Sequence, residues 1–122
     1  MCKAIVVPVS LENKPYLTTI NDYKDYYPVM GCRLFDVISL YKENGLSVDC
    51  YVDDEGAGVA EVNQYFLKPY LSGITAYPIY GTVVINLTDT RSGESADLDL
   101  CLVRKALDLF GLDEDILSSI TE

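Results

Sequence analysis

The sequence predicts a single α+β domain over residues 1–122, in which C-terminal helices cover a mostly antiparallel sheet. Two observations support this fold class. Short apolar segments with strand character, separated by turn residues, fill the first 87 positions, and apolar residues at helical spacing follow in an acidic part at 95–122. With 122 residues and an apolar fraction of 49%, the chain can build one hydrophobic core but not two.

The N-terminal third predicts two strands and a short helix. Residues 4–9 (AIVVPV) form the first strand, with Pro8 at a sheet edge or a strand end, and residues 15–20 form the second. Asn21 is expected to cap a helix that ends at Pro28, because the residue before a proline avoids helical dihedrals. Gly31 then supplies a turn.

A β-hairpin is predicted at residues 34–53. Asn44-Gly45 lies between its arms, and this pair favours the left-handed dihedrals of a two-residue turn. In the second arm, apolar and polar side chains alternate, which predicts one face on the core and one in water. The apolar positions are Leu46, Val48, Cys50 and Val52.

The C-terminal part predicts a central strand followed by helices. Residues 82–87 are apolar on both faces, as in a central strand. A helix over about residues 96–110 is expected to end at Gly111, and Asp113 is expected to cap a last turn that carries Ile116, Leu117 and Ile120. The positions predicted to be buried in the longer helix are Leu98, Cys101, Leu102, Ala106 and Leu109.

The segment 51–64 (YVDDEGAGVAEVNQ) brings three carboxylates and two glycines together. A calcium loop starting at Asp53 would have Ala57 at its fifth position and Gln64 in place of its final glutamate, so its ligand set is incomplete. Asp53 and Asp54 are neighbours on an extended chain, whose side chains point to opposite faces rather than across a cleft. The segment is therefore interpreted as a strand end with no metal site. Gly56 and Gly58 are expected to adopt backbone dihedrals that are closed to other residues.

Other chemistry is equally sparse. The sequence contains no histidine, which excludes Ser-His and Cys-His nucleophile pairs and most zinc sites. It also has no phosphate-binding loop and no dinucleotide fingerprint. The four cysteines show no C-x-x-C pair and are interpreted as reduced thiols, mostly in the core. We therefore expect no enzyme activity and no cofactor.

Charge is the strongest compositional signal. Nine basic against 19 acidic residues give a net charge of -10, which disfavours direct binding to nucleic acid. The apolar run at the N-terminus is too short for a signal peptide or a membrane span, so a soluble cytoplasmic protein is expected. The acids after residue 86 are either a solvated helical face or a surface for a basic partner protein. The candidate partner-binding residues are Asp97, Asp108, Asp113, Glu114 and Asp115.

Tyrosine is the second compositional signal. The chain has ten tyrosines and no tryptophan, and several tyrosines fall in residues 65–80. Tyrosine suits interfaces and stacking on planar ligands, although half-burial over the sheet explains the same pattern. The candidate ligand-binding residues are Tyr65, Lys68, Tyr70, Tyr77 and Tyr80.

The order of several short motifs resembles a known family. Residues 5–8 (IVVP), 20–40 (INDYKDYYPVMGCRLFDVISL), 48–56 (VDCYVDDEG) and 77–85 (YPIYGTVVI) are similar to the small phage- and plasmid-borne proteins of the domain-of-unknown-function family thirty-eight forty-six. The resemblance covers about residues 3–87 and implies a mobile-element origin and a strand-rich fold, without a particular reaction. Cys32 departs from the family's second glycine, and the Leu-Pro pair before Asn63 is absent. The matched positions are Asp22-Tyr23, Gly31, residues 53–56, Asn63, Pro78, Ile79 and Gly81.

Two function classes follow from these observations. In the first, a phage or mobile-element accessory protein binds and inhibits a host protein, such as a component of host defence, through an acidic surface that mimics nucleic acid. In the second, the tyrosine-rich segment forms a pocket that binds or sequesters a nucleotide-like metabolite. Neither class involves a membrane, and both are compatible with a homodimer. The first is favoured, because Lys68 is the only basic residue in the tyrosine-rich segment.

Overall fold

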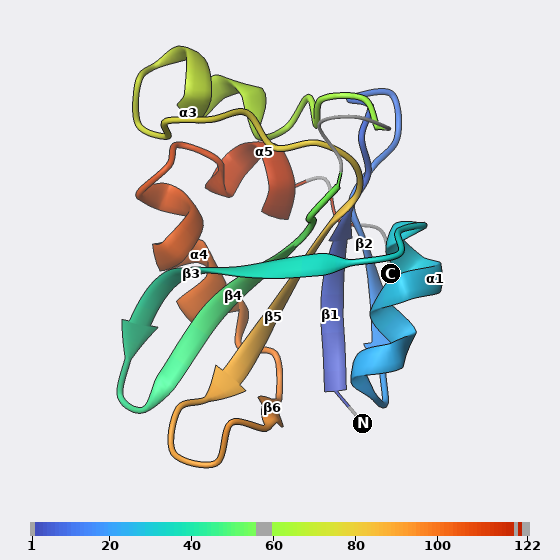
Figure 1. Cartoon of the computed structure of the whole chain (residues 1–122). Coiled ribbons are helices and arrows are strands. Elements are labelled where there is room, and N and C mark those ends of the chain that lie inside the picture. The colour runs from blue at the N-terminus through green and yellow to red at the C-terminus, as the bar shows by residue number, and fades with distance from the viewer. Residues whose placement is uncertain (1, 56–59, 119, 121–122) are drawn as a thin grey trace.

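The chain folds into one antiparallel sheet covered by short helices, which confirms the predicted α+β class (Figure 1). The computed structural model describes residues 2–55, 60–118 and 120. Five strands lie side by side in the order β2-β1-β5-β4-β3, and β6 pairs with β5. The strands are β1 (Cys2–Val7), β2 (Tyr16–Ile20), β3 (Phe35–Glu43), β4 (Leu46–Asp53), β5 (Val83–Asp89) and β6 (Ser95–Ala96).

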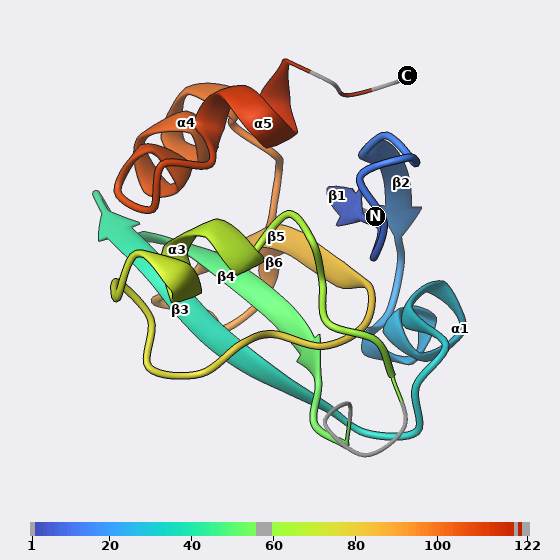
Figure 2. The ribbon, with the colours of Figure 1, turned by 90° about the horizontal axis from the view of Figure 1, so that it is seen from above.

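The helices cover the two faces of the sheet unequally. Helices α3, α4 and α5 lie on one face, whereas a short 3-10 helix and α1 lie on the other (Figure 2). None of the helices among the described residues is long and apolar enough to cross a membrane. Their bounds are Tyr23–Asp25 for the 3-10 helix, α1 (Tyr26–Met30), α3 (Leu67–Leu71), α4 (Leu100–Asp108) and α5 (Asp113–Leu117).

The main core lies between the sheet and helices α3 to α5. The predicted apolar face of β4 is part of it, because Val48, Cys50 and Val52 are buried there and Leu46 packs at its margin. Strand β5 is central, as predicted, and lies between β1 and β4. Pro8 directly follows β1 and therefore marks the strand end rather than an edge.

The hairpin at 34–53 is confirmed, with its turn at the predicted dipeptide. Asn44 and Gly45 have φ angles of 51° and 78°, which place both in the left-handed region that such a turn requires. Strand β3 also contains a bulge between Ser39 and Tyr41. Because of this extra residue, both Leu40 and Tyr41 pack against the main core.

The other face of β4 is not wet, contrary to the prediction. Ser47 and Asp49 are buried, and the Asp49 carboxylate accepts hydrogen bonds from the Ser47 hydroxyl (2.6 Å) and the Thr88 hydroxyl (2.7 Å). Further along this face, Tyr51 stacks on Tyr26 of α1 with ring centroids 4.0 Å apart. Side chains of the neighbouring strands meet Ser47 and Asp49, and Tyr26 of α1 covers Tyr51, so the polar residues on this face have partners within the protein.

The first helical region differs from the prediction in both its start and its end. Asp22, not Asn21, is the cap, and its carboxylate accepts a hydrogen bond from the Lys24 backbone N–H. Pro28 lies inside α1 and does not end it, because a proline in the first turn needs no intrahelical N–H partner. The helix ends at Gly31, which has a φ of 66°.

Helix α4 buries a different face from the predicted one. Leu102 and Ala106 are buried as expected, and Leu98 packs partly against the core, but Cys101 is exposed and Leu109 is 58% exposed. Val103 and Leu107 take their places and are fully buried. The helix also begins at Leu100 rather than near residue 96, because residues 95–96 pair with β5 as β6.

The end of the chain is close to the prediction. Gly111 follows α4 with a φ of 71°, and α5 buries Ile116 as expected while Leu117 and Ile120 pack at the core margin. Asp113 was predicted to cap the last helix, but it is the first residue of α5. The cap is Leu112, which makes no side-chain hydrogen bond to the helix.

Candidate functional site

The three consecutive carboxylates, Asp53 to Glu55, mark the end of β4, as predicted. Strand β4 stops at Asp53, and the Asp53 carboxylate accepts a hydrogen bond from the Glu55 backbone N–H at 2.9 Å. The Glu55 carboxylate is held by the Arg33 guanidinium through two hydrogen bonds, of 3.1 and 2.8 Å, and these bonds lower the pKa of Glu55. Gly56 and Gly58 lie outside the described residues. Among those that are described, no three potential ligands are grouped to hold a metal ion.

A cavity of about 620 Å³ lies beside this strand end. Its floor is the core face of β3 and β4, with Ile38 opposite Cys50 in the strand register. Its other walls come from the start of α3, from residues 75–80 and from Phe110, which follows α4. Ile38 and Tyr77 are 41% and 81% exposed, so the cavity opens to solvent.

The cavity lining is largely apolar, with its acidic groups at one end. Asp53 and Asp54 were predicted to lie on opposite faces of an extended chain, but both contribute to this cavity, because β4 ends at Asp53 and Asp54 already lies in a turn. The rest of the wall is mainly aliphatic and aromatic. No lysine or arginine lines the cavity among the described residues. The apolar and aromatic lining includes Ile38, Leu40, Val52, Phe66, Ile79 and Phe110.

The structure divides the predicted ligand-binding residues between different places. Tyr77 and Tyr80 line the cavity. Tyr65 is largely buried and donates a hydrogen bond to the Asn13 carbonyl oxygen at 2.6 Å, and with Lys68 it lines a second cavity of about 560 Å³ that also includes Glu114 and Asp115. Tyr70 is exposed and lines neither cavity. The Lys68 ammonium lies on α5, where it donates to the Gly111 carbonyl oxygen (3.2 Å) and pairs with Asp115 (3.8 Å).

The Lys68 position matters for ligand chemistry. Lys68 is the only basic residue among the predicted ligand-binding residues, so it was the one side chain expected to neutralise an anionic ligand. It does not line the cavity beside β3 and β4. The cavity therefore offers a negatively charged end and no positive side chain from the described residues. This arrangement opposes a phosphate-bearing ligand, because an anion here would lose its hydration without gaining a countercharge.

Four of the five predicted partner-binding acids lie close together in the chain, and the fifth, Asp97, lies apart from them. Asp108, Asp113, Glu114 and Asp115 lie where α4 ends and α5 begins, and we call these four residues the acidic corner. Asp97 lies before the other end of α4, which is nine residues long or about 13 Å. Asp99 lies between Asp97 and the start of α4, and its role as the cap of this helix was not predicted from the sequence.

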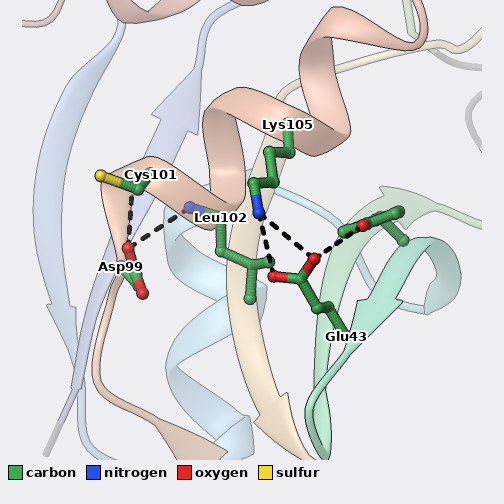
Figure 3. Close-up of polar contacts among 6 residues, drawn as sticks. Glu43, Asp99, Cys101, Leu102 and Lys105 are labelled. Atoms are coloured by element: carbon green, nitrogen blue, oxygen red, sulfur yellow. Dashed lines mark hydrogen bonds and ion pairs between the residues drawn. The ribbon is translucent and has the colours of Figure 1, made fainter.

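Asp99 caps α4, and a second contact fixes the helix to the sheet (Figure 3). The Asp99 carboxylate accepts hydrogen bonds from the backbone N–H groups of Cys101 (3.0 Å) and Leu102 (3.3 Å). One turn later, the Lys105 ammonium lies 3.2 Å from each carboxylate oxygen of Glu43 on β3. These hydrogen bonds raise the pKa of Lys105. Asp108 is thus presented by a helix that is anchored at its start and its middle, whereas the other three residues of the acidic corner lie on α5.

Residue Asn63 organises the chain next to the cavity, a role that sequence reasoning missed. Its side-chain amide donates to the carbonyl oxygens of Val7 (3.3 Å), Pro8 (3.2 Å) and Gly81 (2.9 Å). Its side-chain oxygen accepts from the backbone N–H groups of Tyr65 (3.0 Å) and Phe66 (3.3 Å). A lone asparagine in a loop carries no pattern that predicts five such bonds.

Comparisons with protein-family models, with curated proteins and with solved structures found no match to this chain. The cavity and the acidic corner are therefore interpreted from their own chemistry. The cavity combines an apolar wall with two carboxylates, and the acidic corner combines four carboxylates on two short helices.

Proposed function

We propose that this protein acts by binding a partner protein that has a basic surface, and that it inhibits the partner by covering that surface. The observation that carries the proposal is the unneutralised charge of the acidic corner. Among the described residues, only Asp115 of the four forms an ion pair, and it does so with Lys68 at 3.8 Å. The other three carboxylates are available to a partner's lysines and arginines.

The charge of the whole chain supports the same role. A net charge of -10 creates a field that attracts a basic partner and repels nucleic acid. Each exposed charge contributes little by itself, but together such charges speed encounter and make it depend on salt. In line with the family resemblance, the partner belongs to the bacterial host and meets this protein in the host cytoplasm. Binding, not catalysis, is the proposed activity.

The proposal is tested by association kinetics. The immobilised protein is first used to capture partners from bacterial lysate at low and high salt, and the captured proteins are identified by mass spectrometry. Association rates are then compared between wild type and a variant whose acidic corner is neutralised. That variant carries Asp108→Asn, Asp113→Asn, Glu114→Gln and Asp115→Asn.

A matched control distinguishes the effect of the acidic corner on association from the effect of the protein's net charge. A second variant removes four exposed charges elsewhere, through Asp36→Asn, Asp54→Asn, Glu61→Gln and Glu94→Gln. Both variants should melt close to wild type, because exposed charges add little to folding. We expect the corner variant to associate more slowly and with a flatter salt dependence than the control. Equal rates for the two variants at both salt concentrations would reject the corner as the binding surface.

A second candidate function is the binding of a small ligand in the cavity. The observation that favours it is the cavity volume, about 620 Å³, which lies in the range of small-molecule sites. Its apolar wall with a few grouped polar side chains is also typical of such sites. The two functions use different surfaces, so they can be tested separately.

A further inference from the structure

We propose that the cavity beside β3 and β4 binds an organic cation with an apolar body, such as a substituted alkyl- or arylammonium ion. This inference rests on the second candidate function, the binding of a small ligand, and it adds the chemical class of that ligand. Three features of the cavity carry it: its acidic end, its aromatic side chains and its apolar floor.

The acidic end supplies the countercharge. Asp53 and Asp54 both line the cavity, and Asp54 is exposed. One Asp53 oxygen accepts the Glu55 backbone N–H, so the other retains its acceptor capacity. The nearby Arg33 guanidinium is engaged by Glu55 and does not line the cavity. A cation at this end of the cavity therefore lies beside two acidic residues, and among the described residues no lysine or arginine of the lining competes with it.

The aromatic side chains favour an organic cation in particular. Tyr77, Tyr80, Phe66 and Phe110 all line the cavity, and an aromatic face attracts a cation placed over it. Aromatic walls combined with carboxylates are suited to ammonium ions whose charge is spread over methyl or methylene groups. Tyr77 is 81% exposed, so its ring can meet a ligand at the entrance.

The apolar floor excludes an inorganic cation and requires an apolar body. Cys50 and Val52 are buried at the floor, and Ile38 lies opposite Cys50. A hydrated metal ion needs several oxygen ligands, which this wall does not provide. An alkyl or aryl group, in contrast, gains by leaving water for such a surface. The ligand should therefore place its charge near Asp53 and Asp54 and its apolar part towards Val52 and Phe66.

The test compares three probes of similar size that differ in charge. Benzyltrimethylammonium is the cation, neopentylbenzene is its neutral isostere, and phenylacetate is an anion of similar shape. Each is titrated into the full-length protein labelled with nitrogen-15, and backbone amide shifts are followed. We expect saturable shifts at Ile38, Val52 and Tyr77 with the cation, about tenfold weaker binding of the isostere, and no binding of the anion.

Variants assign the preference to the proposed groups. Asp53→Asn with Asp54→Asn should weaken cation binding about tenfold and leave the isostere unchanged, since the amide oxygen of an asparagine in place of Asp53 can still accept the Glu55 N–H. Glu12→Gln with Glu94→Gln makes the same change in net charge at two exposed positions outside the cavity and should leave both affinities unchanged. Ala76→Trp adds a bulky side chain at the cavity lining and should weaken binding of the cation and its isostere alike. Thermal melting of each variant establishes that it is folded.

The outcomes separate the inference from the function on which it rests. Equal affinity for the cation and its isostere would overturn the cation preference and leave the small-ligand function standing. Shifts that map outside the cavity, or equal weakening by the control at Glu12 and Glu94, would also overturn the inference. Absence of binding by all three probes to folded wild-type protein would overturn both the inference and the small-ligand function. The protein-binding function depends on the acidic corner and is not affected by any of these results.

Discussion

The side-chain amide of Asn63 lies 2.9 Å from the carbonyl oxygen of Gly81, and this hydrogen bond connects the loop before α3 to the start of β5. Gly81 in turn donates its backbone N–H to the Glu61 carbonyl oxygen at 2.8 Å. The φ of Gly81 is 79°, a conformation that favours glycine, and the Asp53 side chain packs next to it. Asp53, Asn63 and Gly81, which are far apart in the sequence, therefore meet at one end of the sheet, beside the cavity.

The first prediction concerns Asn63. Asn63→Ala should lower the free energy of unfolding by about 3 kcal/mol, because it leaves buried backbone groups without partners. Asn13→Ala is the control, since Asn13 is exposed and contributes only its backbone carbonyl to Tyr65. Denaturant unfolding of both variants gives the comparison. A loss below about 1 kcal/mol for Asn63→Ala would show that water replaces these bonds at little cost.

The second prediction tests the orientation of α4. Leu107 is fully buried and Leu109 is 58% exposed, although the two leucines are only two positions apart. Leu107→Ala should therefore destabilise the protein by about 2–5 kcal/mol, and Leu109→Ala by less than about 1 kcal/mol. Thermal and denaturant unfolding measure both. The reverse order would mean that the helix packs with the face that its sequence spacing predicted.

The third prediction tests the register of the hairpin. Val48 is fully buried in the main core, so Val48→Asp places an unpaired charge there at a cost comparable to the whole stability of a domain. Val37 lies on the adjacent edge strand β3 and is 43% exposed. Val37→Asp should consequently remain folded with nearly the wild-type melting temperature. Circular dichroism distinguishes the two, and a cooperatively melting Val48→Asp protein would contradict the register.

The fourth prediction concerns alkaline pH. Tyr26 is buried, and its hydroxyl accepts a hydrogen bond from the Asn86 side-chain amide at 2.6 Å. Burial raises the pKa of Tyr26 above its usual value, more than the Asn86 bond lowers it. Below about pH 10, both the folded and the unfolded chain keep this proton, so Tyr26 leaves stability independent of pH. Above that pH the unfolded chain releases the proton more readily, and the free energy of unfolding should fall.

The variant Tyr26→Phe isolates this effect. It should be less stable at neutral pH, because Asn86 loses an acceptor, but its stability should fall less steeply above about pH 10. Burial also raises the pKa of Cys50, and that contribution is common to both proteins and cancels in the comparison. Denaturant unfolding from about pH 8 to about pH 11 gives the two slopes. If the free energy of unfolding falls equally steeply with pH in wild type and in Tyr26→Phe, the pKa of Tyr26 does not differ between the folded and the unfolded chain.

Features that depend on neighbouring residues were predictable from the sequence. The Asn44-Gly45 turn is an example, because its φ angles of 51° and 78° are ones that asparagine and glycine adopt most readily. The alternation of Val48, Cys50 and Val52 likewise predicted their burial, since a strand has only two faces. The end of β4 at Asp53 follows from similar local preferences.

Features that depend on packing were not predictable in this way. Six of the nine residues of α4 are apolar, all except Arg104, Lys105 and Asp108, so more than one face satisfies helical spacing. The surface of the sheet selected Val103 and Leu107 instead of Cys101 and Leu109. The burial of Asp49 was not predictable either. The alternation along β4 predicted that Asp49 faces water, but its carboxylate accepts hydrogen bonds from the hydroxyl groups of Ser47 and Thr88.

The cavity and the network around Asn63 are decided by tertiary structure alone. The cavity walls come from β3, β4, the start of α3, residues 75–80 and Phe110, which are far apart in the sequence. The sequence determined the residue types available, namely tyrosines, carboxylates and a charge of -10. The fold determined that Tyr77 and Tyr80 share a cavity with Asp53, while Tyr65, Lys68 and Tyr70 do not. The physical reason is that strand pairing and core burial, rather than local spacing, set which distant side chains meet.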